Sequence, residues 1–174
     1  MAETLSTARL RLVPFGPDDA DPLHAQWNDP DVGRWLWDGT PVSREAVAEV
    51  IGDSESSFRE RGYGFFTLRL LEAPEVVIGF AGLRTIGDTP DVEVLYGLLP
   101  AHWGRGLATE AARAVLQWGF ATVGLDAIAA GADPPNAASF AVMQRLRMPF
   151  WKDITLDGRP ARYHRLTVAD FPSA

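Results

Sequence analysis

The sequence has 174 residues, the length of one domain, and 47% of them are hydrophobic, which is enough to fold around a buried core. Its 16 basic and 23 acidic residues give a net charge of −7, which disfavours binding to nucleic acid and suits either a cationic ligand or a solubilising surface. Cysteine is absent, which excludes a disulfide scaffold, a thiolate zinc site and a cysteine nucleophile. No stretch reaches the roughly 18 apolar residues of a membrane span, so we expect a cytoplasmic protein with no membrane partner.

The first part of the chain predicts one strand and two helices. Polar and apolar residues alternate over residues 9–13, as they do in a half-buried strand. A short helix is expected over residues 18–28, and the run Asp29-Pro30-Asp31 is expected to break it. A second helix is expected over residues 43–61, with Ser43 as its N-terminal cap.

The rest of the chain predicts a three-strand meander, two helices around a short strand, and a closing hairpin. The long helix is marked by apolar residues that recur at three- and four-residue spacing. The order β-α-α-β-β-β-α-β-α-β-β indicates one mixed α/β domain over residues 1–174. The expected elements are strands 64–71, 76–85 and 91–99, helix 108–123, strand 127–132, helix 136–146, and the hairpin of 150–154 and 162–168.

The most informative stretch, residues 100–111, joins an expected strand to the start of the long helix through Gly104 and Gly106. Glycine lets main-chain N–H groups approach a ligand closely, and the first helical turn adds unpaired donors and a positive dipole end. Arg105 adds a cation, so the stretch suits a pyrophosphate group; the alternative is a turn in which glycine only permits tight packing. The kinase-like P-loop and the dinucleotide fingerprint are excluded, because neither Gly-Lys-Ser/Thr nor a third glycine in G-x-G-x-x-G spacing follows.

The segment Trp103-Gly104-Arg105-Gly106-Leu107-Ala108 resembles the coenzyme A pyrophosphate loop, Q/R-x-x-G-x-G/A, of the GNAT N-acetyltransferases. Its opening Trp and its continuation through Thr109 as Ala-Thr-Glu-Ala are similar to the RimJ/RimL branch. Three further segments are similar to that branch in the same order, namely Arg9-Leu10-Arg11-Leu12, residues 27–32 and Asn136-Ala137-Ala138-Ser139. The resemblance covers residues 5–168, nearly the whole chain.

The resemblance implies a mixed α/β (α+β) fold with a mostly antiparallel central sheet flanked by helices. The sheet is expected to splay between residues 93–99 and 127–132, with acetyl-CoA as co-substrate in the cleft. Asn136 and Ser139 are then expected to face the thioester, and the main chain of Leu98 and Leu99 to pair with the pantetheine amides. The diphosphate is expected to lie on the loop, whose cofactor-binding residues are Trp103, Gly104, Arg105, Gly106, Leu107, Ala108 and Thr109.

The reaction that the resemblance implies is direct attack of a primary amine on the thioester carbonyl, without a metal. The amine must lose a proton, the oxyanion must be stabilised and the thiolate must gain a proton. Glu93 is the candidate for the first task, directly or through water, unless it is a solvated strand residue. A main-chain N–H near Leu98, exposed by an irregularity at Gly97, is expected to stabilise the oxyanion. Ser139 is the candidate proton donor, unless it only caps its helix; Met143 stands where many GNAT enzymes have tyrosine.

The acceptor side is predicted from aromatic residues near the start of the chain. Trp35, Trp37 and Glu93 are the candidate substrate-binding residues. Trp27, Asp31 and Asp38 are expected to line the same acceptor pocket, where aromatic faces and carboxylates suit an ammonium group; the alternative is that at least two of the three tryptophans pack in the core. By resemblance the leading acceptor is a protein N-terminal amine, and the alternatives are a small-molecule amine or a non-catalytic acyl-CoA-binding module. The three histidines are scattered, so no metal is expected. Homodimers are common in the family, which makes a second copy of the chain a candidate partner.

Overall fold

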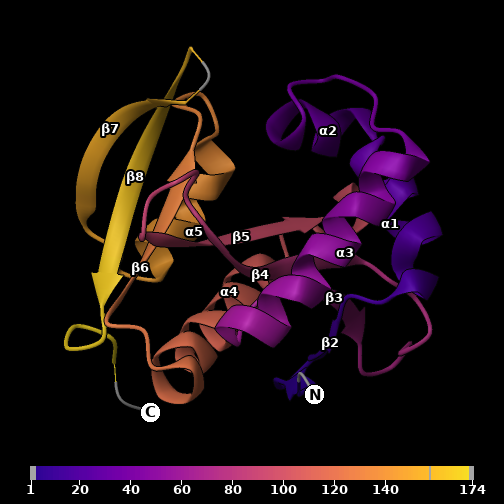
Figure 1. Ribbon diagram of the computed structural model, residues 1–174, viewed down its shortest axis with the longest axis horizontal. Coiled ribbons are helices and arrows are strands. Elements are labelled where there is room, and N and C mark those ends of the chain that lie inside the picture. The colour runs from indigo at the N-terminus through magenta and orange to yellow at the C-terminus, as the bar shows by residue number, and fades with distance from the viewer. Residues whose placement is uncertain (1–2, 157, 173–174) are drawn as a thin grey trace.

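The computed structural model describes residues 3–156 and 158–172, which form one eight-stranded sheet with helices on both faces (Figure 1). The strand order is β1-β2-β3-β4-β5-β6-β8-β7, and every neighbouring pair is antiparallel except β5 and β6. This confirms the expected mixed, mostly antiparallel fold. The strands are β1 (Leu5–Ser6), β2 (Leu10–Pro14), β3 (Phe65–Leu70), β4 (Gly79–Thr85), β5 (Val92–Leu98), β6 (Ala127–Ala132), β7 (Phe150–Leu156) and β8 (Arg159–Thr167). The helices are α1 (Ala20–Trp27), α2 (Pro30–Leu36), α3 (Arg44–Arg61), α4 (Leu107–Trp118) and α5 (Ala137–Arg145).

The two faces of β5 bury different sets of side chains because successive residues of a strand point to opposite faces. Val94 and Leu98 lie in the larger core, where they pack with Leu107, Ala111 and Val115 of α4. Leu95, on the other face, packs in a second core with residues from α1 and α3. Helix α4 therefore covers one face of β5, while α1 and α3 cover the opposite face.

Three elements differ from the sequence-based expectation. Helix α1 ends at Trp27, before the run 29–31 that was expected to break it, but a second helix, α2, begins directly afterwards and was not expected. It forms because Asp29 caps it by accepting a hydrogen bond from the N–H of Asp31, and Pro30 occupies its first turn. The α-helix expected over residues 108–123 ends at Trp118 and continues as a π-helical turn over Gly119–Val123. The short strand β1 was not expected at all.

The sheet divides between β5 and β6. These two parallel strands are paired at one position only, Glu93 with Ala129, whereas β4 and β5 are paired along their whole length from Thr85–Val92 to Gly79–Leu98. Beyond Glu93, the edge of β5 that faces β6 therefore pairs with no strand of the described residues. The expected splay of the sheet is confirmed at this point.

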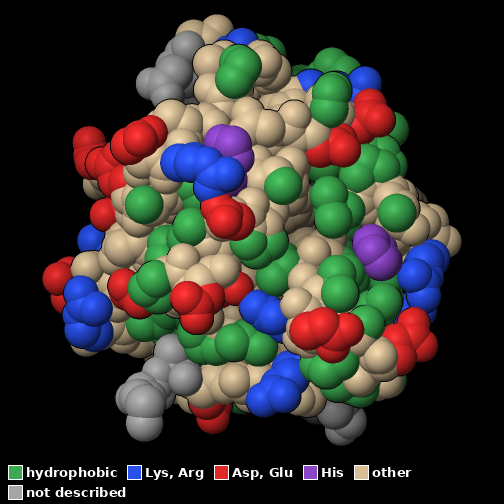
Figure 2. Space-filling view, turned by 90° about the vertical axis from the view of Figure 1, so that its right-hand side faces the viewer, with side chains coloured by type: hydrophobic (Ala, Val, Ile, Leu, Met, Phe, Trp, Pro, Cys, Tyr) green, Lys and Arg blue, Asp and Glu red, His purple; other side chains and the backbone are tan. Residues whose placement is uncertain are grey.

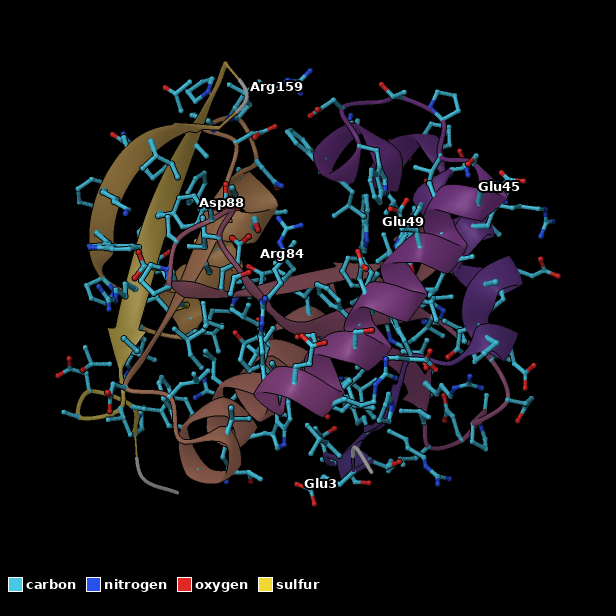
Figure 3. The ribbon with its side chains drawn as sticks, in the orientation of Figure 1. Glu3, Glu45, Glu49, Arg84, Asp88 and Arg159 are labelled. Atoms are coloured by element: carbon cyan, nitrogen blue, oxygen red, sulfur yellow. The ribbon has the colours of Figure 1, made fainter. Side chains whose placement is uncertain are left out.

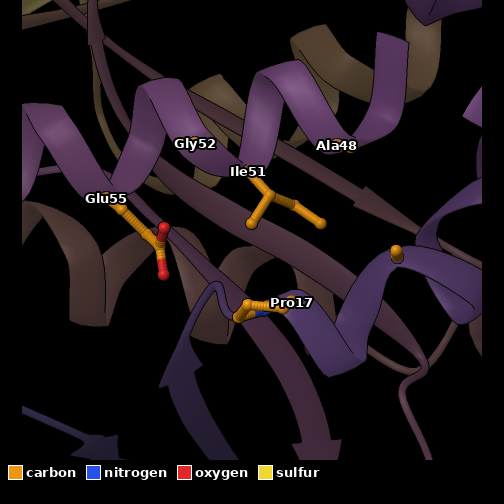
Figure 4. Close-up of a pocket in the computed structure, with 6 residues that line it drawn as sticks. Pro17, Ala48, Ile51, Gly52 and Glu55 are labelled. Atoms are coloured by element: carbon orange, nitrogen blue, oxygen red, sulfur yellow. The ribbon is translucent and has the colours of Figure 1, made fainter. Parts of the chain in front are cut away.

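The surface over α1 to α3 carries acidic and basic side chains interspersed among hydrophobic ones, with no large area of one charge (Figure 2). A pocket of about 270 Å³ lies between Pro17, Ala20 and helix α3, where it is lined by Ala48, Ile51, Gly52 and Glu55 (Figure 4). Within residues 3–156 and 158–172, no helix is long and apolar enough to cross a membrane, and no group of three or more His, Asp or Glu side chains could hold a metal ion.

Candidate active site

The loop between β5 and α4 has a backbone conformation that requires glycine. Gly104 has a φ of +71° and Gly106 a φ of +75°, in the left-handed region that other residues enter only at a cost. Residues 103–106 are exposed, and Gly106 immediately precedes the first residue of α4, Leu107. The loop therefore lies on the surface at the N-terminus of a helix.

The main-chain N–H groups of residues 104–108 bond to no acceptor in the described part of the chain. Among the described residues, none of the amides of residues 104–108 donates a hydrogen bond, and the first bond into the helix runs from Glu110 N–H to the Gly106 carbonyl. The hydroxyl oxygen of Thr109, in the same first turn, is buried and has no partner in the described part of the chain. Five free donors at the positive end of a helix dipole form a site for an anion.

The end of β5 is bonded to the loop and to β4. The indole N–H of Trp103 donates to the Leu98 carbonyl at 2.8 Å, while the Leu99 N–H donates to Ile78 and the Leu99 carbonyl accepts from His102. The Leu99 N–H is thus already used, whereas its carbonyl accepts one bond and has a second lone pair, so the expected pairing of Leu99 with a pantetheine stays a prediction. Leu98 keeps its N–H group for a ligand.

The expected irregularity at Gly97 is wrong, because the β4–β5 ladder runs through Gly97 without a register shift. In an antiparallel ladder the main-chain groups of alternate residues point to opposite sides. Since the Leu99 N–H bonds to Ile78 on the β4 side, the N–H groups of Leu98 and Tyr96 point to the β6 side, where the sheet has divided. The divergence of the strands, and not a bulge, exposes these two amides.

Glu93 is buried, with 3% of its surface exposed, so the alternative of a solvated strand residue is wrong. Its carboxylate accepts a hydrogen bond at 2.9 Å from the Arg84 Nε, its cross-strand partner in β4. Arg84 itself is about half exposed and lies between β8 and the helices α2 and α3 (Figure 3). Burial raises the pKa of Tyr163, and the nearby Glu93 charge raises it further, so a neutral phenol lies beside the carboxylate.

Ser139 lies in the first turn of α5, which is capped by Asn136. The Asn136 side chain accepts a hydrogen bond from the Ser139 N–H at 3.1 Å, so the cap is the asparagine and the serine hydroxyl is not needed for it. That hydroxyl lies 3.2 Å from the phenolic oxygen of Tyr96, on β5. Burial raises the pKa of Tyr96 to about 12, with the hydrogen bond to Ser139 acting in the opposite direction. Met143 is fully buried in the core.

The two candidate tryptophans have different surroundings. Trp37 packs against Trp27 with ring centroids 5.5 Å apart, and its buried indole nitrogen has no partner among the described residues. Trp35 is half-buried, with the guanidinium carbon of Arg34 5.0 Å from its ring centroid. Core packing therefore accounts for Trp27 and Trp37, and Trp35 is the less constrained of the candidate residues.

The structure brings together the loop, the free edge of β5 and the start of α5, all at the divided part of the sheet. Sequence reasoning missed Arg84 and the contact of Tyr96 with Ser139. Arg84 could have been found by aligning the two strands on either side of the 87–90 turn, which sets Arg84 opposite Glu93. The Tyr96 contact joins residues 43 positions apart and left no local signal.

Comparisons with known proteins agree with this geometry. Residues 9–149 match the family model described as an acetyltransferase (GNAT) domain. The chain is 30% identical over 145 residues to the uncharacterized N-acetyltransferase p20 of Bacillus licheniformis, which covers 83% of this chain and 81% of that protein. It superposes on RimJ of Mycobacterium smegmatis, in complex with CoA-disulfide, with a TM-score of 0.83 at 18% identity, covering 99% of this chain and 91% of that one. It superposes on RimL, a ribosomal L7/L12 α-N-protein acetyltransferase solved with coenzyme A, with a TM-score of 0.80 at 16% identity, covering 95% and 98% of the two chains. The chain belongs to the GNAT family of acetyltransferases.

Proposed function

We propose that this chain transfers the acetyl group of acetyl-CoA to the N-terminal amine of a protein. The observation that carries the proposed use of acetyl-CoA is the set of N–H groups of residues 104–108, at the N-terminus of α4, which bond to no residue that the structure describes. A diphosphate presents several anionic oxygens to such a set of donors, so these residues fit coenzyme A. When bound, acetyl-CoA supplies an activated acetyl group.

Further residues are suited to bind other parts of acetyl-CoA. The side chain of Arg105 is exposed beside the free amides and is suited to a phosphate oxygen, and Thr109 offers its unpartnered hydroxyl. The Leu98 N–H, on the free edge of β5, is suited to a pantetheine carbonyl or to the thioester oxygen. Asn136 holds the first turn of α5 so that Ser139 lies beside this edge, next to Tyr96.

In the proposed reaction the neutral amine attacks the thioester carbon, an N–C bond forms and the C–S bond breaks. Glu93 accepts the amine proton directly or through water, because it is a buried carboxylate on β5 where the sheet divides. An N–H group of Leu98 or Tyr96 stabilises the oxyanion. The Ser139 hydroxyl donates a proton to the departing thiolate and regains one from solvent, while Glu93 releases to solvent the proton that it took from the amine. The products are therefore the acetylated amine and coenzyme A, and the enzyme is restored.

The protein N-terminus is favoured as acceptor by two arguments. RimL and RimJ share the fold over nearly the whole chain, and RimL is described as acting on the α-amine of a ribosomal protein. The net charge of −7 suits a basic peptide, and half-buried Trp35 can contact its backbone or side chains.

The test is acetyl transfer from acetyl-CoA to a panel of peptides and small amines by the purified chain. Mass spectrometry should place the acetyl group on the α-amine of basic peptides and leave peptides with a blocked N-terminus unmodified, even when they contain lysine. Polyamines and aminoglycosides in the same panel should react poorly. Faster acetylation of a small amine would contradict the proposed acceptor, and binding of acetyl-CoA without transfer to any acceptor would contradict the proposed activity.

A further inference from the structure

A cluster of polar side chains joins the start of the sheet to the candidate diphosphate loop. Thr7 and Arg9, which lie between β1 and β2, both contact Glu110 in the first turn of α4. The Thr7 hydroxyl donates to Glu110 Oε1 at 2.6 Å, the Arg9 N–H donates to the same oxygen at 3.0 Å, and Arg9 Nε donates to Oε2 at 2.7 Å. We call these three residues the Thr7–Arg9–Glu110 latch.

The latch also holds the loop directly. Arg9 Nη1 donates to the main-chain carbonyl of Arg105 at 2.9 Å, across 96 positions of sequence. The carbonyl of Arg105 and the N–H of Gly106 belong to one planar trans peptide, in which they point in opposite directions. A bond that fixes the carbonyl toward Arg9 therefore aims the Gly106 N–H away from it, where no described residue accepts it.

The latch also reduces the electrostatic repulsion between the Glu110 carboxylate and an anion bound at the N-terminus of α4. Glu110 lies in the first turn of the helix whose N-terminus is proposed to hold a diphosphate, and a free carboxylate there repels an anion. Burial alone would raise the pKa of Glu110, but hydrogen bonds from Thr7 and Arg9 outweigh it and lower the pKa below its ordinary value. The carboxylate is thus charged, and Arg9 Nη2, 2.6 Å from Oε2, neutralises it.

We infer that Arg9 is a positioning residue for diphosphate recognition: it fixes the Arg105–Gly106 peptide and neutralises Glu110, so that the loop binds the diphosphate in a prearranged form. This inference rests on the proposed use of acetyl-CoA. It also gives a role to the Arg9-Leu10-Arg11-Leu12 segment, whose two leucines are core residues.

The test compares Arg9→Gln with wild type, using two acetyl donors, one that contains the diphosphate and one that does not. Arg11→Gln is the matched control, because Arg11 is an exposed arginine on the same segment. Calorimetry with coenzyme A should show affinity at least about tenfold lower for Arg9→Gln and within about twofold of wild type for Arg11→Gln. In kinetics, kcat/KM should fall by a similar factor with acetyl-CoA but stay within about twofold with S-acetylpantetheine, which has no diphosphate.

Each outcome decides the inference. Unchanged affinity of Arg9→Gln for coenzyme A overturns it, and so does an equal loss with both donors, because a merely destabilised protein would lose activity with either. If Arg9→Gln does not fold, Arg9→Lys is used instead, which keeps the positive charge but loses the planar guanidinium. Its kcat/KM with acetyl-CoA is expected to fall by at least about threefold, with no such fall for S-acetylpantetheine. If the wild-type protein binds no coenzyme A, the proposed function itself is refuted. If the wild-type protein binds coenzyme A and Arg9→Gln binds it equally well, only the role of Arg9 is refuted.

Discussion

The phenolic oxygen of Tyr96 lies 3.2 Å from the hydroxyl oxygen of Ser139, and also 3.2 Å from the Ser139 carbonyl. This contact joins β5 to the first turn of α5 beside the point where the sheet divides. With Met143 buried in the core, α5 contributes no tyrosine one turn after Ser139. The phenol at this site comes from the strand, and because burial raises its pKa to about 12 it remains a hydrogen-bond donor at neutral pH.

Ser139→Ala is expected to lower kcat by about 100-fold, because it removes the proposed proton donor to the thiolate. The affinity for coenzyme A should stay within about threefold of wild type, since the loop amides are untouched. Tyr96→Phe keeps the ring and should lower kcat by about tenfold through loss of the hydrogen bond that orients Ser139. Steady-state kinetics and calorimetry on the same preparations measure both quantities.

Ser57→Ala, on α3 and outside the site, serves as the control for these hydroxyl deletions and should behave as wild type. Wild-type turnover by Ser139→Ala would remove Ser139 from the mechanism. A Tyr96→Phe effect as large as that of Ser139→Ala would instead assign the donated proton to the phenol.

Glu93→Gln is expected to lower kcat/KM by about 100-fold or more, because the amide has nearly the same shape but cannot accept the amine proton. Binding of coenzyme A should be unaffected. Glu72→Gln, at an exposed position in the turn after β3, is the matched control. The comparison is made by measuring initial rates with saturating acetyl-CoA at several acceptor concentrations. An active Glu93→Gln variant would show that Glu93 serves the fold alone, through its ion pair with Arg84.

The order of helices and strands along the chain was predictable because most of these elements have a strong local sequence pattern. The apolar stripe of α4 and the Ser43 cap of α3 are examples, and in the structure Ser43 accepts a hydrogen bond from the Ala46 N–H. Helix α2 was missed because the pair Asp29-Pro30 is typical both of the end of one helix and of the start of another. The same pair ends the preceding helix and, as cap and first-turn proline, begins the next one.

The candidate site was predictable where glycine spacing encodes a backbone shape, as at Gly104 and Gly106. It was not predictable where tertiary contacts decide the environment. The burial of Glu93 depends on Arg84 across the hairpin and on the nearby Tyr163, and the support of the loop depends on Arg9, nearly 100 residues away. Such contacts become visible only when strands and helices are packed together.

Gly106→Ala is expected to lower the affinity for coenzyme A by about tenfold, and Gly106→Trp to abolish binding. A residue with a side chain at φ +75° costs roughly 1–2 kcal/mol, which the loop can relieve by turning its amides away from the ligand. Gly62→Ala is a matched control, since Gly62 also has a positive φ, +81°, but lies at the end of α3 with open space around it. It should lower the melting temperature to a similar degree and leave the affinity unchanged. Calorimetry and thermal unfolding on both variants separate strain from recognition, and equal affinities of Gly106→Ala and Gly62→Ala would contradict the role of the loop.

Alkaline pH should destabilise the fold through Tyr96. Burial raises its pKa from 10.0 to about 12, so below about pH 10 the phenol is neutral in both the folded and the unfolded chain and its contribution to stability is complete. Between about pH 10 and pH 12 the unfolded chain loses this proton while the folded chain keeps it, so the free energy of unfolding falls, by roughly 2–3 kcal/mol for a shift of this size. Tyr96→Phe has no such proton, and its free energy of unfolding, measured by urea denaturation across this range, should fall less steeply than that of wild type. Parallel curves for the two proteins would mean that the Tyr96 phenol ionises as readily in the folded chain as in the unfolded one.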